Sequence, residues 1–256
     1  MRNGTIEEYN KRKHFEVKKM KIAHLGHSTI YLELADGIKI IIDPYIDANL
    51  PEMWQADHLK VDYIILTHGH GDHVAGVFDL IKHQQPTIIA VAEIANFFAK
   101  LGQKVHGMNI GGGFDFPFGR VTMTHALHTS SLEYEGQVHY LGNPAGIIIE
   151  ADGKTFYHAG DTAEFMEMDL LGEDYEIDFA CLPIGDNYTM GPKQAARCAK
   201  RIQAKTVLPI HYNTFPVIEQ DPQKFIDLLT DAKGIVLPFG EMYEMSITPT
   251  YRSGSL

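Results

Sequence analysis

Residues 61–73 read VDYIILTHGHGDH, an apolar run that ends in four side chains able to bind a metal ion. Residues 61–66 are apolar and rich in β-branched residues, which is typical of a strand buried on both faces. Imidazole nitrogens and carboxylate oxygens are the ligands that zinc and related divalent cations prefer. Four of them within six residues are too many for one tetrahedral ion, so the spacing predicts two adjacent ions. The four side chains are those of His68, His70, Asp72 and His73.

The ligands of this motif fall into two groups. We expect His68 and His70, two residues apart on a flat loop, to point to one ion position. Asp72 and His73 begin the following predicted helix and point to a second position. The two glycines between these residues carry no side chain that could obstruct either group.

Strand and helix patterns alternate on both sides of the motif. The dipeptides Asp36-Gly37 and Asp152-Gly153 are strong signals for hairpin turns. Sheets that alternate with helices and hairpins favour an α/β (α+β) fold with a two-sheet core and helices outside. Strands are expected at residues 21–25, 29–34, 38–43, 61–67, 87–91, 121–127, 146–150, 154–160, 178–183 and 206–210, and helices at 73–83, 92–101, 192–204 and 222–232, before a final strand pair.

A shift of 116 residues aligns three segments of the chain with three later ones. Segments 25–26, 35–37 and 61–66 then fall on 141–142, 151–153 and 177–182 without a gap. Recurrence of common strand and hairpin signals is one explanation, and duplication is the other. We favour a duplication that makes two similar β-rich halves with the site between them. It requires residues 21–68 and 137–184 to superpose.

The chain has 256 residues, 45% of them hydrophobic, and a net charge of −11. This length suits a single core, which we place at residues 20–250. The negative charge argues against binding nucleic acid or anionic membranes by bulk electrostatics. Residues 1–19 are interpreted as a native extension or a vector-derived remnant, and residues 251–256 as a tail.

Cysteine usage and hydropathy predict a cytoplasmic location. The two cysteines, Cys181 and Cys198, cannot form a disulfide framework and fit a reducing compartment. The N-terminal residues contain no apolar core of a signal peptide. The most apolar long stretch, residues 87–99, is interrupted by Glu93 and Asn96 and is too short to span a membrane.

The motif at residues 68–73 resembles the signature of the metallo-β-lactamase superfamily. The resemblance implies an αββα four-layer sandwich with metal ligands on loops at one edge of the two sheets. It also implies a third histidine, a bridging aspartate and a final histidine, in this chain order. His128, Asp161 and His211, each just past a predicted strand, match these three positions.

Three further segments are similar to a bacterial group of metal-dependent hydrolases related to the ascorbate-6-phosphate lactonases. They are KIAHLGHST at residues 21–29, PIGDNYTMGP at 183–192 and HYNTFP at 211–216. The chain departs from other branches of the superfamily. His70 replaces the glutamate usual in the flavodiiron oxidoreductases, and no cysteine occupies a ligand position between His128 and His211, as one does in many β-lactamases.

The resemblance implies a hydrolase with two divalent cations, bridged by Asp161 and a hydroxide. The metal-bound hydroxide would attack a small ester, lactone or phosphoester, whose oxygen the ions polarise. Asp72 would orient the hydroxide and pass its proton to the leaving group. Zinc or manganese is expected, and iron or nickel also suits such ligands. The first ion is assigned to His68, His70 and His128, and the second to Asp72, His73 and His211.

Four other residues are candidates for substrate contact or ligand support. His27 lies in an early turn, and contact with substrate and a structural role are equally open. Asn187 and Tyr188 are candidate donors to an oxyanion, with a plain loop before a helix as the alternative. Asp43 is a candidate acceptor for a ligand histidine, or a turn residue before a proline. The histidines within strand patterns, interpreted as packed or supporting residues, are His24, His125 and His158.

Three other functions are compatible with these ligands. A phosphodiesterase or nuclease needs a basic surface patch, which the net charge of −11 disfavours. An iron-dependent oxidoreductase would be recognised by its metal. A non-catalytic metal-binding protein is disfavoured because it has no need for an open water site. We expect a small-molecule substrate, no nucleic-acid or membrane partner, and a homo-oligomer by family analogy alone.

Overall fold

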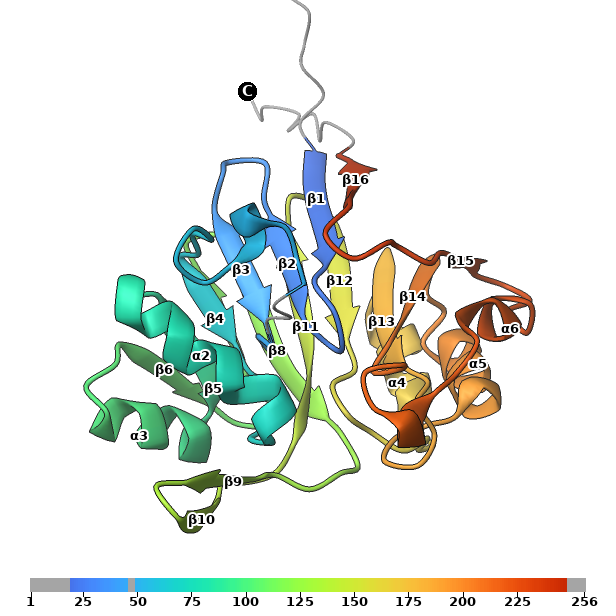
Figure 1. The fold of residues 1–256 in the computed structure, drawn as a ribbon. Helices are drawn as coiled ribbons and strands as arrows, with labels where there is room; N and C mark the ends of the chain where they lie inside the picture. Colours follow the sequence, from blue (N-terminus) through green and yellow to red (C-terminus); the bar gives the residue numbers. More distant parts are fainter. Residues whose placement is uncertain (1–18, 46–48, 248–256) are drawn as a thin grey trace, which may run out of the picture.

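The computed structural model describes residues 19–45 and 49–247 (Figure 1). Two large sheets flanked by helices form an α/β fold, which confirms the predicted architecture. The extension predicted at 1–19 and the tail predicted at 251–256 lie outside the described residues, except for Lys19, where the first strand begins. Within the described ranges, no helix has the length and apolar character needed to cross a membrane.

Each large sheet has seven strands. The first has the order β16-β1-β2-β3-β4-β5-β6, and the second β15-β14-β13-β12-β11-β8-β7. The strands of the first sheet are β1 (Lys19–His24), β2 (Ile30–Glu33), β3 (Lys39–Ile42), β4 (Tyr63–Ile65), β5 (Thr87–Val91), β6 (Val105–Met108) and β16 (Met242–Ser246). Those of the second are β7 (Gly113–Phe116), β8 (Gly119–His125), β11 (Ala145–Ala151), β12 (Lys154–His158), β13 (Phe179–Pro183), β14 (Thr206–Ile210) and β15 (Lys233–Gly234).

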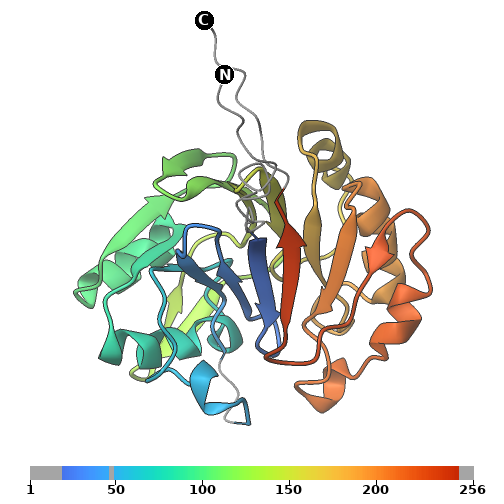
Figure 2. The same cartoon turned by 90° about the horizontal axis from the view of Figure 1, so that it is seen from above.

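Helices cover the outer side of each sheet (Figure 2). α2 (Gly71–His83) and α3 (Ala92–Lys100) lie beside the first sheet. α4 (Met168–Asp174), α5 (Pro192–Arg201) and α6 (Pro222–Ile226) lie beside the second. The remaining elements are the short helices η1 (Glu52–Trp54) and η2 (Pro216–Ile218) and a separate hairpin of β9 (Ser131–Tyr134) and β10 (Gln137–Tyr140).

The pleat of the second sheet divides its side chains between two cores. Ile147 and Ile149 of β11 belong to the cluster between the sheets, whereas Ile148 packs on the opposite face with residues of α4, α5 and α6. β4 is similarly enclosed, since Ile64 and Ile65 are fully buried. Strands buried on both faces explain why the sequence shows continuous apolar runs instead of alternation.

The strands that precede the predicted ligands end at one edge of the molecule. β1, β3 and β4 run in the same direction in the first sheet. β8, β12, β13 and β14 share one direction in the second. In Figure 1, β3 and β12 both point to the lower edge. The loops that follow these strands are therefore brought together.

The strand pairing of the predicted repeat recurs for part of its length. The antiparallel pair β2–β3 and the parallel pair β3–β4 recur as β11–β12 and β12–β13. Equivalent hydrogen bonds also recur at a shift of 116, as Asp43 N to Ile65 O and Ala159 N to Cys181 O, and as Lys39 N to Asp62 Oδ2 and Thr155 N to Asp178 Oδ2. The repeat is wrong for β1, whose sequence counterpart is β10 in the separate hairpin, while β8 takes the equivalent place in the second sheet.

Two expectations for the C-terminal part are wrong. The helix predicted for 222–232 ends at Ile226, where Leu228 and Leu229 make turns that bond three residues back. These turns bring β15 alongside β14. The final strands are not a pair either, because β15 joins the second sheet and β16 pairs with β1 in the first. Pairing with strands distant in sequence overrides local propensity at both places.

A close approach at Gly76 sets α2 against the end of β3. The Gly76 amide donates a hydrogen bond to Pro44 O at 2.8 Å. A Cβ at this position would lie 2.6 Å from the same oxygen, so only glycine fits without a shift of the backbone. This contact fixes His73, one turn earlier on the helix, relative to Asp43.

We expect Gly76→Ala to lower the free energy of unfolding by about 1–3 kcal/mol, because the added methyl group forces α2 away from Pro44. Urea denaturation measures the change. Gly71→Ala, in the same helix but with no atom within 4 Å of the new Cβ, is the matched control and should be neutral or stabilising. Equal stability of the two variants would contradict this account of the contact.

Candidate metal centre

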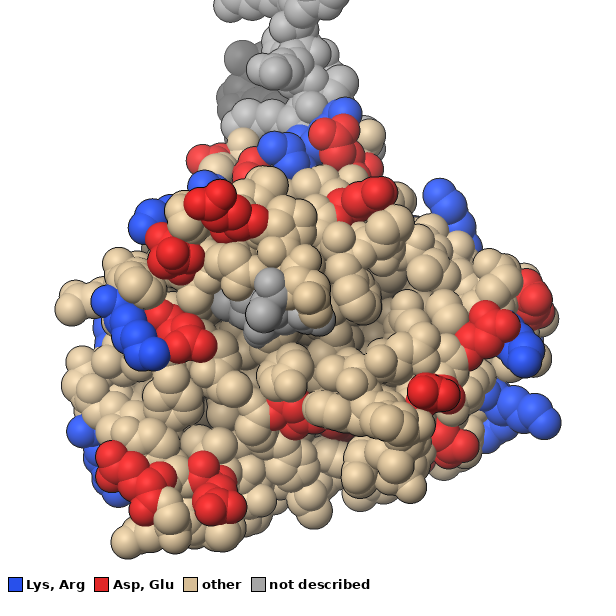
Figure 3. Space-filling model, in the orientation of Figure 1, with Lys and Arg blue, Asp and Glu red and all other residues tan. Residues whose placement is uncertain are grey.

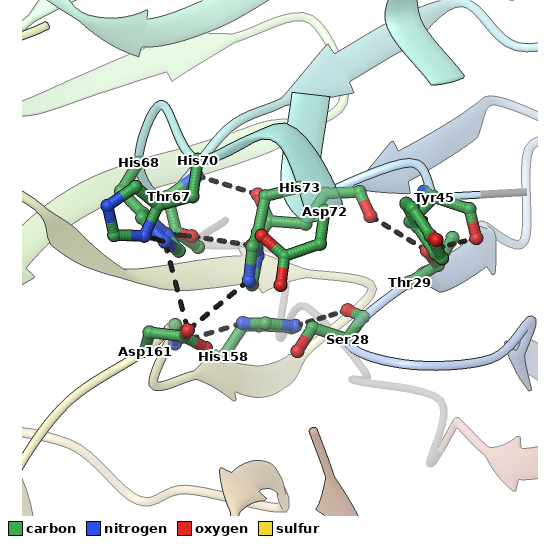
Figure 4. Close-up of polar contacts among 12 residues, drawn as sticks. Ser28, Thr29, Tyr45, Thr67, His68, His70, Asp72, His73, His158 and Asp161 are labelled. Atoms are coloured by element: carbon green, nitrogen blue, oxygen red, sulfur yellow. Dashed lines mark hydrogen bonds and ion pairs between the residues drawn. The ribbon is translucent and has the colours of Figure 1, made fainter. Parts of the chain in front are cut away.

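The loops at the common edge bring the seven predicted metal ligands together. Figure 4 shows five of them, His68, His70, Asp72, His73 and Asp161. The seven come from the loop between β4 and α2, from the first turn of α2, and from the segments after β8, β12 and β14. The donor atoms form three overlapping groups, each within 4.8 Å. Two of them, His68, His70, His128 and Asp161 on one side and His27, Asp72, His73 and His211 on the other, contain all seven predicted ligands, and the third joins Asp43 to His68 and His73. The structure therefore places the seven residues where a shared site requires them, and their assignment as ligands stays a prediction.

One oxygen of Asp161 lies between the two groups. Asp161 Oδ2 is 2.9 Å from His211 Nε2 and 3.4 Å from His73 Nε2. On its other side it is 3.6 Å from His128 Nε2 and 3.8 Å from His68 Nε2. The side chain is only 3% exposed. A single buried carboxylate oxygen thus faces both groups, as a bridging ligand would.

The spacing of the first group suits a tetrahedral ion. Ligands about 2.0–2.2 Å from such an ion lie about 3.3–3.6 Å from one another. His68 Nε2 and His70 Nδ1 are 3.0 Å apart, close to this separation. Gly69, between them, must be glycine, because a Cβ there would lie 2.7 Å from Leu141 Cδ1. Gly71 has open space at its Cβ position, so its lack of a side chain is not required there.

Asp43 orients two of the predicted ligand histidines, His73 by a direct hydrogen bond and His68 through Thr67. Its Oδ2 accepts a hydrogen bond from His73 Nδ1 at 2.8 Å, which leaves His73 Nε2 free to face the site. The hydroxyl of Thr67 donates to the same oxygen and lies 3.0 Å from His68 Nδ1. His68 Nδ1–H can donate to that hydroxyl, so His68 Nε2 is the unprotonated nitrogen and faces His70 and Asp161. Such partners fix the tautomer and direction of a metal-binding imidazole.

Buried histidines secure the turns beneath the site. His24 Nε2 lies 2.9 Å from the carbonyl oxygen of His27, and His158 Nε2 lies 2.9 Å from that of Ser28. His158 Nδ1 accepts a hydrogen bond from Gly160 N at 3.0 Å, next to Asp161. His24 and His158 are thus packed supporting residues, as the strand patterns indicated, whereas His125 is exposed.

Burial and mutual charge set the protonation of the centre. Burial opposes ionisation of Asp161, but His73 and His211 outweigh it and hold the pKa of Asp161 well below its usual range. Burial likewise opposes protonation of His73, yet Asp161 and Asp43 raise its pKa well above the ordinary value. Burial, with His73 nearby, lowers the pKa of His68, which stays neutral. A cation bound here would displace the proton of His73 and take its place as the partner of Asp161.

Two buried atoms at the centre fit a bound cation. Asp161 Oδ1 and His73 Nε2 have no hydrogen-bond partner among the described residues. A buried polar atom left unpaired costs about 1–3 kcal/mol, so native proteins rarely tolerate two in one cluster. Both atoms are competent metal ligands, and a divalent cation would satisfy them. The donor set therefore fits one or more metal ions.

A cleft of about 570 Å³ lies over the cluster. Its floor includes five of the seven predicted ligands, all except His68 and His73, and Thr129, Tyr188, Phe215 and Val217 also line it. Tyr188 therefore lies where a substrate donor was predicted. Asn187 is exposed but does not line the cleft.

His27 is placed under the site and away from the cleft. Its side chain is fully buried, and its Nε2 lies 3.1 Å from Asp72 Oδ2. Its Nδ1 lies 2.8 Å from Thr214 Oγ1. Burial opposes ionisation of Asp72, but the bond from His27 and the nearby His73 outweigh it and hold the pKa of Asp72 below its ordinary value.

Sequence reasoning missed five residues of the site. The hydroxyl of Thr67 contacts His68, that of Thr214 contacts His27, and Thr129, Phe215 and Val217 line the cleft. Each of them lies in or beside a quoted motif or directly follows a predicted ligand. Their short distance in sequence from His68, His128 and His211 was the available signal.

Comparison with known proteins places the chain in a family. A model described as a beta-lactamase superfamily domain matches residues 39–212. The chain belongs to this superfamily. The motif at residues 68–73 therefore identified the family correctly from the sequence.

Relatives and solved structures narrow the place of the chain within the metallo-β-lactamase superfamily. A UPF0173 metal-dependent hydrolase of Bacillus cytotoxicus is 49% identical over 224 residues, covering 87% of this chain and 98% of that protein. The corresponding protein of Anoxybacillus flavithermus is 49% identical over 227 residues, which cover 88% of this chain and 100% of that protein. The structure of Igni18, a metallo hydrolase of the archaeon Ignicoccus hospitalis, matches with a TM-score of 0.80 and 35% sequence identity. The match covers 90% of this chain and 100% of Igni18. The predicted resemblance to bacterial metal-dependent hydrolases is confirmed.

We expect Asp43→Asn to weaken metal binding about 10- to 100-fold, because an amide NH₂ would face the N–H of His73 and the hydroxyl of Thr67. Competition with a chromogenic chelator measures the affinity. Asp62→Asn is the matched control, since Asp62 accepts a hydrogen bond from Lys39 N near the start of β3, the strand that Asp43 follows. An unchanged affinity in Asp43→Asn, or an equal loss in the control, would contradict this role.

Proposed function

We propose that the chain is a dinuclear metal-dependent hydrolase that cleaves a small ester, lactone or phosphoester. The observation that carries the proposal is the position of Asp161 Oδ2 between two sets of histidine nitrogens. The relatives named metal-dependent hydrolases, at 49% identity, support it.

The two ion positions follow the two groups of donor atoms. The first would be held by His68, His70 and His128 and the second by Asp72, His73 and His211, with Asp161 shared. Zinc or manganese suits this donor set, and iron or nickel is compatible with it. When bound, two such ions lower the pKa of a coordinated water towards about 7 and polarise a carbonyl or phosphoryl oxygen.

We assign to Asp72 the role of accepting the proton of the attacking water. Its side chain is 27% exposed and lines the cleft, so it can reach a substrate as well as the cluster. Asp72 is a carboxylate at neutral pH and can accept this proton, and its lowered pKa makes it a weak base that readily passes the proton on. It can then hand the proton to the leaving group.

His27 is proposed as the residue that positions Asp72. Its Nε2–H can donate to Asp72 Oδ2, while Thr214 donates to its Nδ1. With both nitrogens committed and the ring buried, His27 holds the carboxylate in one orientation. The hydroxyl of Tyr188 is proposed as a donor to the developing oxyanion.

The surface supports a small-molecule substrate over nucleic acid. Among the described residues, no lysine or arginine lines the cleft. Figure 3 shows the Lys and Arg side chains of one face as separate patches near its rim, without a continuous basic surface. Nucleic-acid binding depends on such basic surfaces. A cytoplasmic location stays part of the proposal.

Asp161→Asn tests the proposal, because the amide cannot bridge two cations. We expect the parent protein to bind about two equivalents of zinc or manganese and to hydrolyse a chromogenic lactone or phosphodiester. The variant should lose at least one equivalent by elemental analysis, and its kcat should fall at least about 100-fold.

Asp79→Asn provides the control for this substitution. Asp79 lies on the exposed face of α2, where it pairs with Lys82, so metal content and kcat should not change. Retention of both metal equivalents and activity in Asp161→Asn would refute the dinuclear assignment. Stoichiometric iron without hydrolysis of either probe would favour an oxidoreductase on the same ligands.

A further inference from the structure

The wall of the cleft above the metal ligands is apolar. It is formed by Phe215 and Val217 on the segment after β14 and by the ring of Tyr188 on the segment after β13. Tyr188 and Val217 are 56% and 57% exposed, so their apolar atoms face solvent at the opening of the site. Exposed apolar side chains grouped beside a polar floor are typical of a substrate-binding surface.

The segment that carries Phe215 and Val217 is held in one shape. Asn213 N donates to Ile218 O at 3.0 Å, and Asn213 Oδ1 accepts from Gln220 N at 2.8 Å. Ile218 is fully buried and anchors the segment in the protein. The Phe215 ring also lies 5.6 Å, centroid to centroid, from the ring of His27. The apolar wall is therefore preformed.

The loop that carries Tyr188 is also fixed. Asp186 N donates to Met190 O at 3.0 Å, which closes the loop on itself. Met190 N donates to Thr162 O at 3.0 Å, next to Asp161 in the chain. The backbone that carries Tyr188 is thus tied to the segment that supplies the central carboxylate. The side chain of Tyr188 lines the cleft from this loop.

The charged groups that line the cleft lie on its floor. Apart from histidines, the only ionisable groups among the described lining residues are the carboxylates of Asp72 and Asp161 and, on the wall, the phenol of Tyr188. The arginines of the described ranges form ion pairs outside the cleft. Arg120 pairs with Asp115, Arg197 with Glu164 and Arg201 with Asp169. Among the described residues, no lysine or arginine lines the wall to pair with a charged substituent that extends along it.

From this arrangement we infer the class of substrate: an ester or lactone whose substituent beyond the scissile bond is a short, uncharged alkyl or aryl group. The inference rests on the hydrolase function proposed above and narrows its substrate. A phosphate or carboxylate on that substituent would lose water against an apolar wall without gaining a partner. Sites that select such anions supply arginine or lysine for them. A substrate that carries a phosphate on that substituent is therefore expected to bind more weakly than its uncharged counterpart.

A pair of hydroxamic acids tests the inference on the zinc-loaded protein. Both carry the same metal-binding head, and their tails are a propyl group in butyrohydroxamic acid and a carboxyethyl group in succinic monohydroxamic acid. We expect the propyl compound to bind at least about tenfold more tightly by isothermal titration calorimetry. The matched 4-nitrophenyl butyrate and mono-4-nitrophenyl succinate should differ in kcat/KM in the same direction.

Val217→Lys adds the missing cation to the wall. Because the position is 57% exposed, the substitution is compatible with folding. The ratio of the two dissociation constants should shift towards the carboxylate by at least about tenfold. Val217→Met, which is long and uncharged, should retain the preference of the parent protein for the propyl tail.

The possible outcomes distinguish failure of the substrate inference from failure of the hydrolase proposal. Equal or tighter binding of the carboxylate compound by the parent protein overturns the substrate inference and leaves the hydrolase proposal standing. Binding of neither hydroxamic acid overturns the metal centre, and the substrate inference with it. Preference for the propyl tail, with no hydrolysis of either ester, supports the binding of an uncharged substituent by the wall and contradicts ester hydrolysis.

Discussion

The buried charge of Asp161 is the constraint on which the rest of the site depends. A carboxylate that is 3% exposed costs several kcal/mol to bury unless charges or dipoles compensate it. Compensation comes from histidines on three separate segments, those after β4, β8 and β14. Because these strands belong to two sheets, the same interaction joins the sheets at one edge. In the proposed enzyme, two cations share this carboxylate.

Support for the centre extends outward through hydrogen bonds of fully buried groups. Asp43 and Thr67 direct His73 and His68 from the first sheet. His158, on β12 of the second sheet, reaches the carbonyl oxygen of Ser28 in the first. The two sheets are thus bonded to each other beside the site as well as through it. Ligand directions are fixed by the fold, which is the condition for a preorganised metal site.

The sequence predicted the parts of this protein that local patterns determine. The run at residues 61–73 predicted a buried strand followed by ligands, because apolar periodicity and ligand chemistry are both local. The partner of β16 and the short length of α6 depend on pairing with distant strands, which no local pattern shows. The sequence could not decide the role of His27 for the same reason. That role depends on contacts with Asp72 and Thr214, which are 45 and 187 residues away in the chain. The apolar wall was missed because its shape comes from the bonds of Asn213.

Anomalous diffraction from crystals of the zinc- or manganese-loaded protein tests the central claim most directly. The account predicts two peaks about 3.5–4 Å apart, one on each side of Asp161 Oδ2. One peak should lie among His68, His70 and His128, and the other among Asp72, His73 and His211. A single peak, or a pair of peaks that Asp161 does not touch, would contradict it.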